Sequence, residues 1–372
     1  METPFSPFPN VFAKRRVFIT GHTGFKGSWL TVWLHLLGAE ITGFSLPPQR
    51  GNDHFEELGL RRMIRHIEGD VRDAAALTEA MGKSRPEFVF HLAAQPLVRR
   101  SYRDPKMTFD TNIGGSVNLL EAVRSVGSVR VLIYVTSDKC YRPRERARGF
   151  KETDPLGGHD PYSTSKACAE LILSSYQSSF FEGSKVSAAS VRAGNIIGGG
   201  DWSEDRIVPD CIRALSAGRA IPVRNPDAVR PWQHVLEPIG GYLRLATFLR
   251  SAQGADYRGG WNFGPSQDSH RPVQDLVDAA ITNWGGGRIE SVQPVAGRGT
   301  FAETKTLYLN CDKASQVLDW HPTWDFHQSV ARTVEWYKLA LGGADVWKLT
   351  TWQLHAYCAM SRTGRVVEGP AA

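Results

Sequence analysis

Short apolar runs alternate with longer segments of helical character through the first half of the chain. The runs are rich in β-branched and aromatic residues and are bounded by glycine, proline or charged residues, as are strands buried inside a sheet. They predict strands at residues 17–20, 40–46, 63–69, 87–92, 130–136 and 186–192, with helices at about 27–37, 104–126 and 162–181. Strands that alternate with helices pair in parallel through right-handed crossovers. We therefore expect an α/β protein with a doubly wound parallel sheet.

The alternation ends after residue 192. Glycine and proline become more frequent, tryptophans appear and the apolar segments shorten. This change predicts a smaller, interleaved C-terminal lobe. We assign residues 11–192 and about 232–262 to the sheet domain, 193–231 and 263–360 to the smaller lobe, and 361–372 to a disordered tail.

The composition is that of an ordinary globular protein, with 41% hydrophobic and 22% charged residues and a net charge of +6. No run approaches the roughly 20 apolar residues that cross a bilayer. Residues 1–16 lack the continuous apolar core of a signal peptide, and the five cysteines show no C-x-x-C pair, which indicates reduced thiols. We therefore expect a cytoplasmic protein with no membrane contact and no metal site.

One predicted loop is rich in basic residues: Arg142, Arg144, Arg146, Arg148 and Lys151. Such a cluster is typical of a solvated loop, and otherwise favours a phosphate-bearing ligand over nucleic acid. We expect no nucleic-acid partner.

A glycine-rich loop lies between the first predicted strand and the first predicted helix. It contains Gly21, His22, Thr23, Gly24, Phe25, Lys26 and Gly27. In a dinucleotide site, the first glycine of such a triplet turns the chain, the second admits the pyrophosphate and the third lets the helix pack closely. The pyrophosphate then lies at the positive N-terminal end of the helix. The loop predicts a Rossmann-type dinucleotide-binding domain in which His22 and Lys26 place basic side chains beside the phosphates.

Later strand ends add expected cofactor contacts. These are Ser45, Asp70, Val71, Leu92, Ala93 and Ala94. Asp70 suits an adenine amine, and the small residues after the fourth strand let backbone line the cofactor. The second strand ends without the acidic residue that would hold a ribose 2′-hydroxyl, whereas Arg50 nearby suits a 2′-phosphate. These residues by themselves permit NAD or NADP.

Tyr162 and Lys166 begin a predicted helix whose N-cap is Asp160. A spacing of four places both side chains on one helix face. An ammonium near a phenol favours the phenolate and lowers a pKa that is about 10 in free tyrosine. Such a tyrosine can exchange a proton with a sugar or alcohol hydroxyl at neutral pH.

Ser137, Asp138 and Lys139 follow the fifth predicted strand, at the sheet edge where doubly wound folds bind ligands. Ser137 is placed to hydrogen-bond a substrate hydroxyl together with Tyr162. The Tyr162/Lys166 pair explains oxidation of a hydroxyl. The acid and the lysine beside Ser137 indicate an elimination step as well.

Taken together, these segments resemble the sugar-nucleotide-modifying branch of the extended short-chain dehydrogenase/reductases and, within it, the CDP-glucose 4,6-dehydratases. The resemblance runs from about residue 11 to residue 360. It is carried by GHTGFKG (21–27), SLPP (45–48), TSDKCY (136–141), GGHDPYS (157–163), RAGN (192–195) and RPWQHV (230–235).

The resemblance implies NAD as cofactor, CDP-glucose as substrate and a role in deoxysugar synthesis for surface polysaccharides such as lipopolysaccharide O-antigen. Hydride would pass from C4 of the glucose unit to NAD and return to C6 after water is lost across C5 and C6. Asp138 would protonate the leaving hydroxyl. Lys139 would be the C5 base or would hold the enolate oxygen.

Further positions follow from the same resemblance. Asn195, Arg206 and Arg230 would contact the substrate diphosphate, with Asn262 in the same wall. The missing ribose acid is shared with this branch, which uses NAD. A homodimer would pair the helices at about 104–126 and 161–181.

Two other classes of protein fit parts of the pattern. Another sugar-nucleotide enzyme on this scaffold, such as a different dehydratase, a 4-epimerase or a decarboxylase, would share the cofactor loop. An epimerase needs Tyr162 and Lys166 but not the acid and lysine beside Ser137. A catalytically silent nucleotide-sensing protein would be expected to lose Tyr162, Lys166 or the glycine loop, and all are present. We therefore expect a lyase.

Overall fold

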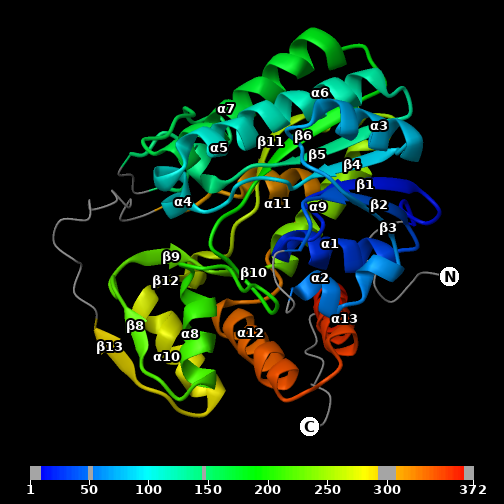
Figure 1. The fold of residues 1–372 in the computed structure, drawn as a ribbon. Helices are drawn as coiled ribbons and strands as arrows, with labels where there is room; N and C mark the ends of the chain where they lie inside the picture. Colours follow the sequence, from blue (N-terminus) through cyan, green and yellow to red (C-terminus); the bar gives the residue numbers. More distant parts are fainter. Residues whose placement is uncertain (1–9, 49–52, 145–147, 292–306, 364–372) are drawn as a thin grey trace.

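The computed structural model describes residues 10–48, 53–144, 148–291 and 307–363. Its central sheet has seven parallel strands in the order β11-β6-β5-β4-β1-β2-β3 (Figure 1). The strands are β1 (Arg16–Thr20), β2 (Glu40–Ser45), β3 (Arg65–Glu68), β4 (Phe88–His91), β5 (Val131–Val135), β6 (Ser187–Arg192) and β11 (Gly259–Asn262). The first six correspond to the predicted apolar runs. The doubly wound α/β fold is confirmed.

The sheet is buried on both faces, which explains its continuous apolar strands. In β1, Val17 and Ile19 belong to one hydrophobic cluster and Phe18 belongs to the other. The chain runs from β1 outward to β3 and then returns to the other side of β1 to form β4. This reversal opens a crevice at the carboxyl ends of β1 and β4, where ligands bind in such folds.

Helices cover each face of the sheet (Figure 1). One layer holds α3 (Ala74–Ser84), α6 (Gly115–Ser125) and α7 (Pro161–Tyr176), and α4 (Val98–Arg103) and α5 (Pro105–Phe109) pack on α7. The other layer holds α1 (Phe25–Leu36), α9 (Leu236–Leu249), α11 (Asp312–Leu318) and α13 (Val346–Thr363). Asp160 caps α7 by accepting a hydrogen bond from the Ser163 amide at 2.9 Å, as predicted.

The helix predicted at 104–126 is interrupted. A π-helical stretch, Asp110–Gly114, separates α5 from α6, and α7 likewise continues as a π-helical stretch at Gln177–Phe181. The first interruption lies where Asn112 hydrogen-bonds the backbone of Gln95 in the loop after β4. Periodicity does not record such a bond, because the loop and the helix are joined only in the folded chain.

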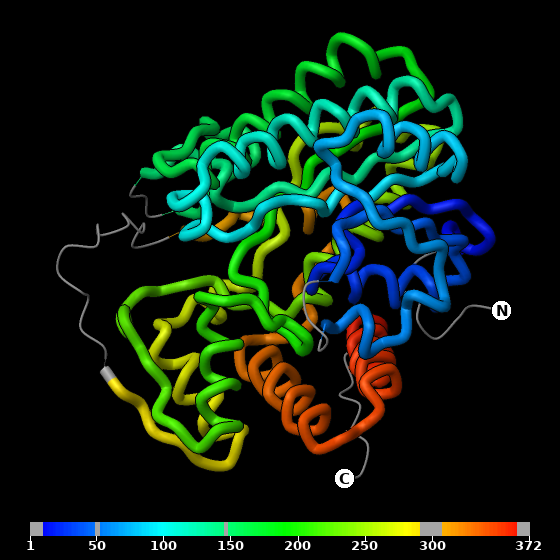
Figure 2. The backbone as a smooth tube through the Cα atoms, viewed as in Figure 1, coloured from blue at the N-terminus to red at the C-terminus, as the bar shows by residue number. Residues whose placement is uncertain are grey.

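The smaller lobe packs around its own hydrophobic cluster, below the sheet in Figure 2. Its elements are α8 (Ile207–Ser216), β8 (Ile221–Val223), β9 (Val229–Pro231), β12 (His270–Pro272), α10 (Val273–Trp284), β13 (Ile289–Ser291) and α12 (Phe326–Leu341). β8 pairs with β13 in parallel, and β9 pairs with β12 antiparallel. The short strands β7 (Ile196–Ile197) and β10 (Gln233–His234) pair where the chain passes between the lobes.

The last helices return to the sheet domain. α11 contacts α9 and β11, and α13 contacts α1. α13 extends through Thr363, so the first three residues of the predicted tail are helical and the rest lies outside the described residues. The domain boundaries stay a prediction. In the described segments, no helix is long and apolar enough to cross a membrane.

The remaining short elements connect the larger ones. They are α2 (His54–Glu57) and the 3₁₀ turns Leu60–Arg62, Asp138–Cys140, Gly254–Tyr257 and Gln267–Ser269.

Candidate active site

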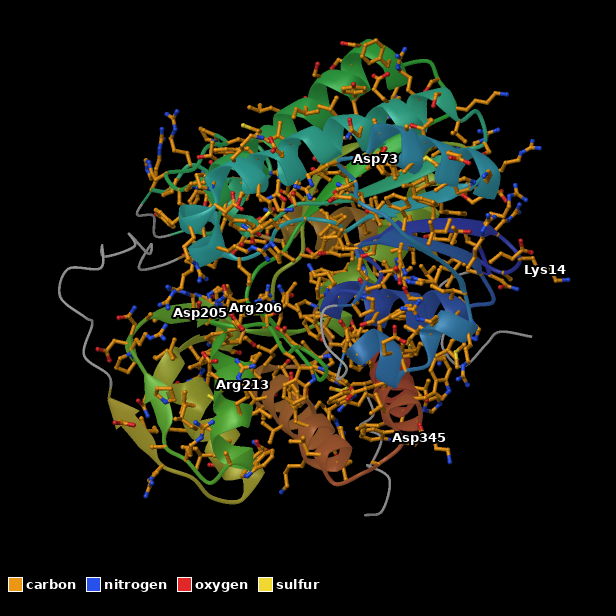
Figure 3. All side chains as sticks on the ribbon, in the orientation of Figure 1. Lys14, Asp73, Asp205, Arg206, Arg213 and Asp345 are labelled. Carbon is orange, nitrogen blue, oxygen red and sulfur yellow. The ribbon has the colours of Figure 1, made fainter. Side chains whose placement is uncertain are left out.

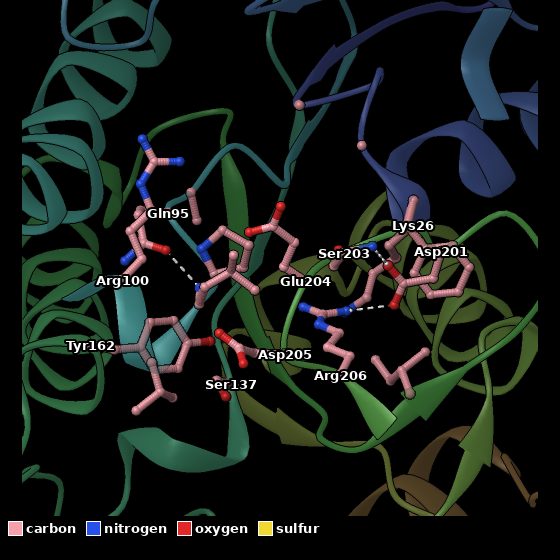
Figure 4. A pocket seen from close by; sticks show the side chains of 18 of the residues that line it. Lys26, Gln95, Arg100, Ser137, Tyr162, Asp201, Ser203, Glu204, Asp205 and Arg206 are labelled. Atoms are coloured by element: carbon pink, nitrogen blue, oxygen red, sulfur yellow. Dashed lines mark hydrogen bonds and ion pairs between the residues drawn. The ribbon is translucent and has the colours of Figure 1, made fainter. Parts of the chain in front are cut away.

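A cavity of about 1260 Å³ follows the carboxyl edge of the sheet and separates it from the smaller lobe. Figure 4 shows side chains from both sides of this cavity, with Tyr162 and Ser137 on the sheet side and Arg206 on the side of the smaller lobe. In Figure 3, Asp205 and Arg206 lie on the part of the smaller lobe that faces the sheet. The predicted crevice is therefore a two-sided site.

The glycine loop forms the floor of one end of the cavity. Gly21 has φ +76°, and a Cβ there would lie 2.7 Å from the Ala93 backbone nitrogen. A Cβ on Gly27 would lie 2.1 Å from the Gly21 carbonyl oxygen. Gly24 faces the cavity and leaves open the space in front of the first turn of α1, which begins at Phe25. This geometry matches what a pyrophosphate needs: close backbone and a helix N-terminus.

The other predicted cofactor positions also line the cavity. These are Thr23, Phe25, Lys26, Ser45, Asp70, Val71, Leu92, Ala93 and Ala94. Thr23 and Ser45 share a hydrogen bond of 2.8 Å, which ties the glycine loop to the end of β2. Arg72 donates to both carboxylate oxygens of Asp70 and keeps the pKa of that carboxyl below its usual value. Arg50 lies outside the described residues.

His22 differs from its predicted position. Its side chain is fully buried beneath β2 and does not reach the cavity. Its ring occupies the space left by Gly43, where a Cβ would lie 2.4 Å from it, and its Nε2 is 2.7 Å from Nδ1 of His66. Burial first, and His66 second, lower the pKa of His22 to about 3, so the ring is neutral. It brings no positive charge to a phosphate.

Lys26 does face the cavity. Its Nζ donates to the Tyr242 hydroxyl at 3.3 Å. Burial, helped by the nearby charges of Lys166 and Arg206, lowers the pKa of Lys26 to about 7. Of the two basic side chains predicted beside the phosphates, Lys26 lines the cavity and His22 does not.

Ser137 caps the 3₁₀ turn Asp138–Cys140, which follows β5 and carries Asp138 and Lys139. The Ser137 hydroxyl donates to Asp138 Oδ1 at 2.9 Å and accepts from the Lys139 amide at 3.2 Å. The Asp138 carboxylate is 3% exposed and packs against the bare Cα of Gly194. Serine, acid and lysine are therefore presented together at the cavity wall.

Tyr162 and Lys166 approach this turn from the first turns of α7, and both are buried. Burial raises the pKa of Tyr162 to about 12, although its hydrogen bond with Ser137 works in the opposite direction. Burial also lowers the pKa of Lys166 to about 8, and its Nζ donates to the Val135 carbonyl at 3.4 Å. The pKa of Tyr162 is therefore raised, opposite to the lowering predicted from the lysine, because desolvation of the phenol is the largest influence on it.

Three of the four predicted substrate-binding positions line the smaller-lobe side of the cavity: Asn195, Arg206 and Arg230. Arg206 forms an ion pair of 2.9 Å with buried Asp201. Asn262 does not line the cavity. It is fully buried, accepts a hydrogen bond from the Tyr141 hydroxyl and donates to the Phe150 and Asn310 carbonyls. It lies behind the turn Ser137–Cys140, which we call the catalytic turn.

The sequence did not single out Asp201, Gly194 or Asn112, which nevertheless shape the site. Asp201 orients Arg206, and Gly194 makes room for Asp138. Asn112 bonds the Gln95 backbone and donates to Ser165 Oγ at 2.9 Å, which fixes the start of α7. Gly194 stands within the motif 192–195, but only the folded chain shows what its missing side chain admits.

Chemically, the cavity offers a buried phenol and amine for proton exchange with a hydroxyl, and an acid and a second amine for elimination. The arginines on its other wall suit an anionic group such as a diphosphate. Within the described residues, no group of three histidine, cysteine or acidic side chains is placed to hold a metal ion.

Comparisons with known proteins agree with this description. The family model for GDP-mannose 4,6-dehydratase matches residues 18–333. The chain is 44% identical over 342 residues to a CDP-glucose 4,6-dehydratase of Salmonella typhimurium, covering 91% of this chain and 94% of that protein. It is 30% identical to a dTDP-glucose 4,6-dehydratase of Streptomyces antibioticus, covering 74% of this chain and 76% of that protein.

Solved structures show the same fold. A UDP-glucose 4-epimerase of Thermus thermophilus in complex with NAD has a TM-score of 0.73 and 24% identity, covering 87% of this chain and 99% of that one. A dTDP-glucose 4,6-dehydratase of Streptomyces venezuelae with NAD bound has a TM-score of 0.73 and 22% identity, covering 88% of this chain and 98% of that one.

Proposed function

Because the chain belongs to the GDP-mannose 4,6-dehydratase family, we propose that it is an NAD-dependent sugar-nucleotide 4,6-dehydratase. It is a hydro-lyase that converts CDP-D-glucose to CDP-4-dehydro-6-deoxy-D-glucose and water, in deoxysugar synthesis. The observation that carries the proposal is the juxtaposition of Ser137–Lys139 with Tyr162 and Lys166 in one cavity. The redox pair would serve any enzyme of this fold, whereas an acid and an amine beside it are needed for elimination. The relative from Salmonella supports cytosine as the base of the nucleotide.

The residues present fit NAD. Gly21 and Gly27 form a backbone cradle that a side chain would fill, at the N-terminus of α1. We assign the pyrophosphate to residues 21–27, the adenosine to Ser45, Asp70 and Val71, and the nicotinamide half to Leu92–Ala94, Tyr162 and Lys166. When bound, NAD supplies the acceptor for the C4 hydride of the glucose unit and the donor that returns it to C6.

Tyr162 takes the proton from the O4 hydroxyl, with Ser137 hydrogen-bonding the same oxygen. The pKa of about 12 at Tyr162 means that a positive charge must stabilise the phenolate that accepts this proton. Lys166 can supply that charge, because its pKa of about 8 leaves most of it protonated at neutral pH. The two side chains act as one proton-exchanging unit.

The resulting ketone at C4 acidifies the C5 proton. Asp138 delivers a proton to the leaving C6 hydroxyl, since it lies in the turn beside Ser137. Lys139 faces the same cavity and either takes the C5 proton as a free amine or holds the enolate oxygen as a cation. If Lys139 takes the C5 proton, water leaves once Asp138 protonates the C6 hydroxyl. If Lys139 only holds the enolate oxygen, the Asp138 carboxylate takes the C5 proton and passes it to the C6 hydroxyl, and the same water leaves.

On the opposite wall, Asn195, Arg206 and Arg230 hold the diphosphate. Arginine suits this task because its planar fork donates two parallel hydrogen bonds. Asp201 fixes the position of Arg206. We assign the nucleoside to the smaller lobe beyond these residues.

We also propose that the enzyme is a cytoplasmic homodimer whose subunits pair through α5, α6 and α7. All five cysteines are free thiols, which supports a reducing compartment. The outer side of α7 carries Leu171, which is 58% exposed and apolar. A larger surface patch of this kind is typical of an interface.

The test uses CDP-glucose deuterated at C4. We expect a 4-keto product with deuterium at C6, and much slower conversion of dTDP-glucose and GDP-glucose. Unchanged substrate, or inversion at C4, contradicts the proposal. If deuterium reaches C6 from dTDP-glucose but not from CDP-glucose, the proposed dehydration stands and cytosine is ruled out as the nucleotide base.

A further inference from the structure

Behind the catalytic turn lies a buried carboxylate that the reaction described above does not use. Glu170 follows Lys166 by one turn of α7 and is 5% exposed. Arg192 on β6 donates to both of its oxygens, from Nε at 2.9 Å and from Nη2 at 2.7 Å. The Ser190 hydroxyl donates to it at 2.6 Å, and the Thr136 hydroxyl donates as well. Burial alone would raise the pKa of Glu170, but Arg192 and these hydroxyls keep it lowered, so the carboxylate is ionised.

Two of these contacts lead directly to the catalytic turn. Thr136 is the residue before Ser137, and its hydroxyl ties the end of β5 to α7. On the far side of the turn, Arg192 donates to the Tyr141 hydroxyl at 2.6 Å and stacks over the Tyr141 ring at 4.9 Å. The residues that precede and follow Ser137–Cys140 are therefore both attached to the Glu170–Arg192 pair.

The fold reserves space for this pair. A Cβ on Gly260 of β11 would lie 2.5 Å from an Arg192 guanidinium nitrogen. Tyr141 in turn donates to Asn262, at the end of the same strand, at 2.8 Å. This accounts for Asn262, which lies outside the cavity: it anchors the back of the turn.

From these contacts, and resting on the proposed function, we propose that Glu170 is a positioning residue that couples the redox helix α7 to the turn carrying Ser137, Asp138 and Lys139. Clamped by Arg192, it holds Thr136 so that the elimination groups stay in register with Tyr162. Its negative charge also stands one turn from Lys166.

The charge of Glu170 acts on Lys166 and also contributes to raising the pKa values of Tyr134 and Cys140. Other titratable groups that interact with Lys166 come from three further elements: Cys140 from the turn, His91 from β4 and Lys26 from α1. Burial lowers the pKa of Lys166 to about 8, and Glu170 is the largest influence in the opposite direction. Loss of that charge would let Lys166 lose its proton at lower pH.

The test compares two substitutions that each remove one hydroxyl from the same carboxylate. Thr136→Val removes the link to the catalytic turn, and Ser190→Ala removes a link to β6 alone. We expect Thr136→Val to lower kcat for CDP-glucose about tenfold with KM within twofold, because misplaced catalytic groups slow the reaction without weakening substrate binding. Ser190→Ala should leave both constants within twofold, and Thr136→Ser, which restores the hydroxyl, should recover most of kcat.

Equal kcat values for Thr136→Val and Ser190→Ala, at similar melting temperatures, would overturn the proposal by making both contacts merely structural. Failure of the wild-type chain to form a 4-keto product would instead reject the proposed function.

Glu170→Gln tests the charge: in a folded variant, the alkaline limb of the pH–rate profile should move down by on the order of one unit. If the alkaline limb does not move, the charge of Glu170 does not support the protonated form of Lys166. Because this variant leaves Arg192 without its counter-ion, its folding is checked first. Whether or not it folds, the Thr136 variants test the coupling between α7 and the catalytic turn.

Discussion

At the residue scale, the contact between Asp138 and Gly194 sets how the acid is placed. A Cβ at position 194 would lie 2.0 Å from Asp138 Oδ2, closer than any side chain can approach. The backbone of Gly194 is itself held by Gln233, which donates to its carbonyl at 3.0 Å. The carboxylate, rather than the backbone, would have to move if residue 194 carried a side chain.

We therefore expect Gly194→Ala to act like Asp138→Asn. Both should lower dehydration of CDP-glucose by roughly 100-fold, as loss of a general acid does. Both should spare oxidation, which can be measured alone with CDP-6-deoxyglucose because this substrate has no hydroxyl to lose and NADH accumulates. The readout is absorbance at 340 nm against formation of 4-keto product.

The control for this pair is Gly82→Ala in α3, where an added Cβ meets no atom within 4 Å. It should leave both rates unchanged. Equal loss of oxidation and dehydration in Gly194→Ala would show that the substitution disturbs the whole site and not the acid.

The position of a site residue could be predicted from the sequence where the residue stands in a motif at the end of a predicted element. Where packing against a distant segment decides whether a side chain is buried, its position could not be predicted. Tyr162, Lys166 and Ser137 stand at the ends of predicted elements, so their meeting followed from the fold class. His22 stands in the same loop as Lys26, yet Gly43 on the neighbouring strand opens a space that takes its ring away from the cavity. Nothing near His22 in sequence signals that space.

At the element scale, α7 does two jobs. Its inner face carries Tyr162 and Lys166 into the cavity and Glu170 behind it, and its outer face exposes Leu171. The π-helical stretch that continues α7 exposes Phe180, at 46%. Strand and helix order could be read from the apolar pattern, but the π-helical stretches could not. The first of them lies where Asn112 bonds the backbone of Gln95, a contact between separate segments of the chain.

If subunits pair through α7, a charge on its outer face should separate them. We expect Leu171→Glu to convert a dimer to a monomer, because burying an unpaired carboxylate in an interface is costly. Light scattering after size-exclusion chromatography measures the mass. Val317→Glu on α11 is the matched control, since Val317 is 48% exposed and lies in the other helix layer. A dimer that survives Leu171→Glu but not Val317→Glu would place the interface on the other layer.

At the scale of the whole molecule, the two lobes are joined across the cavity by charges as well as by the crossing chain. Asp205 in the smaller lobe pairs with Arg99 of α4 at 2.8 Å and with Arg224, which follows β8, at 3.5 Å. The lobe division followed from the change in composition after residue 192. The interleaving was predicted as well, but which late helices return to the sheet could not be read from the pattern, because α11 contacts α9 and β11, and α13 contacts α1, only in the folded chain.

Four histidines, from separate parts of the chain, are buried in the interior of the protein. They are His22, His54, His91 and His234, and burial lowers the pKa of each to about 3. Unfolded, each would have a pKa near 6.5. Their contribution to stability is therefore fully present above about pH 6.5 and is lost as the pH falls toward 3. Buried Glu237, whose pKa burial raises to about 7, works in the opposite direction, since its contribution is lost as the pH rises from about 4.5 to 7.

Because four histidines outweigh that carboxyl, we expect the free energy of unfolding to decrease as the pH falls below about 6.5. Each histidine that binds a proton only when unfolded contributes a slope of about 1.4 kcal/mol per pH unit. Urea unfolding between pH 7.5 and 4.5 measures the total pH dependence of the free energy of unfolding.

His54→Gln removes one such group while keeping a hydrogen-bonding side chain beside Ser28, so the slope should become shallower by about 1.4 kcal/mol per pH unit even if the variant is less stable at pH 7.5. His321→Gln, at a side chain that is 65% exposed, should leave the slope unchanged. Equal slopes for the wild type and His54→Gln would mean that His54 can bind its proton without unfolding the chain.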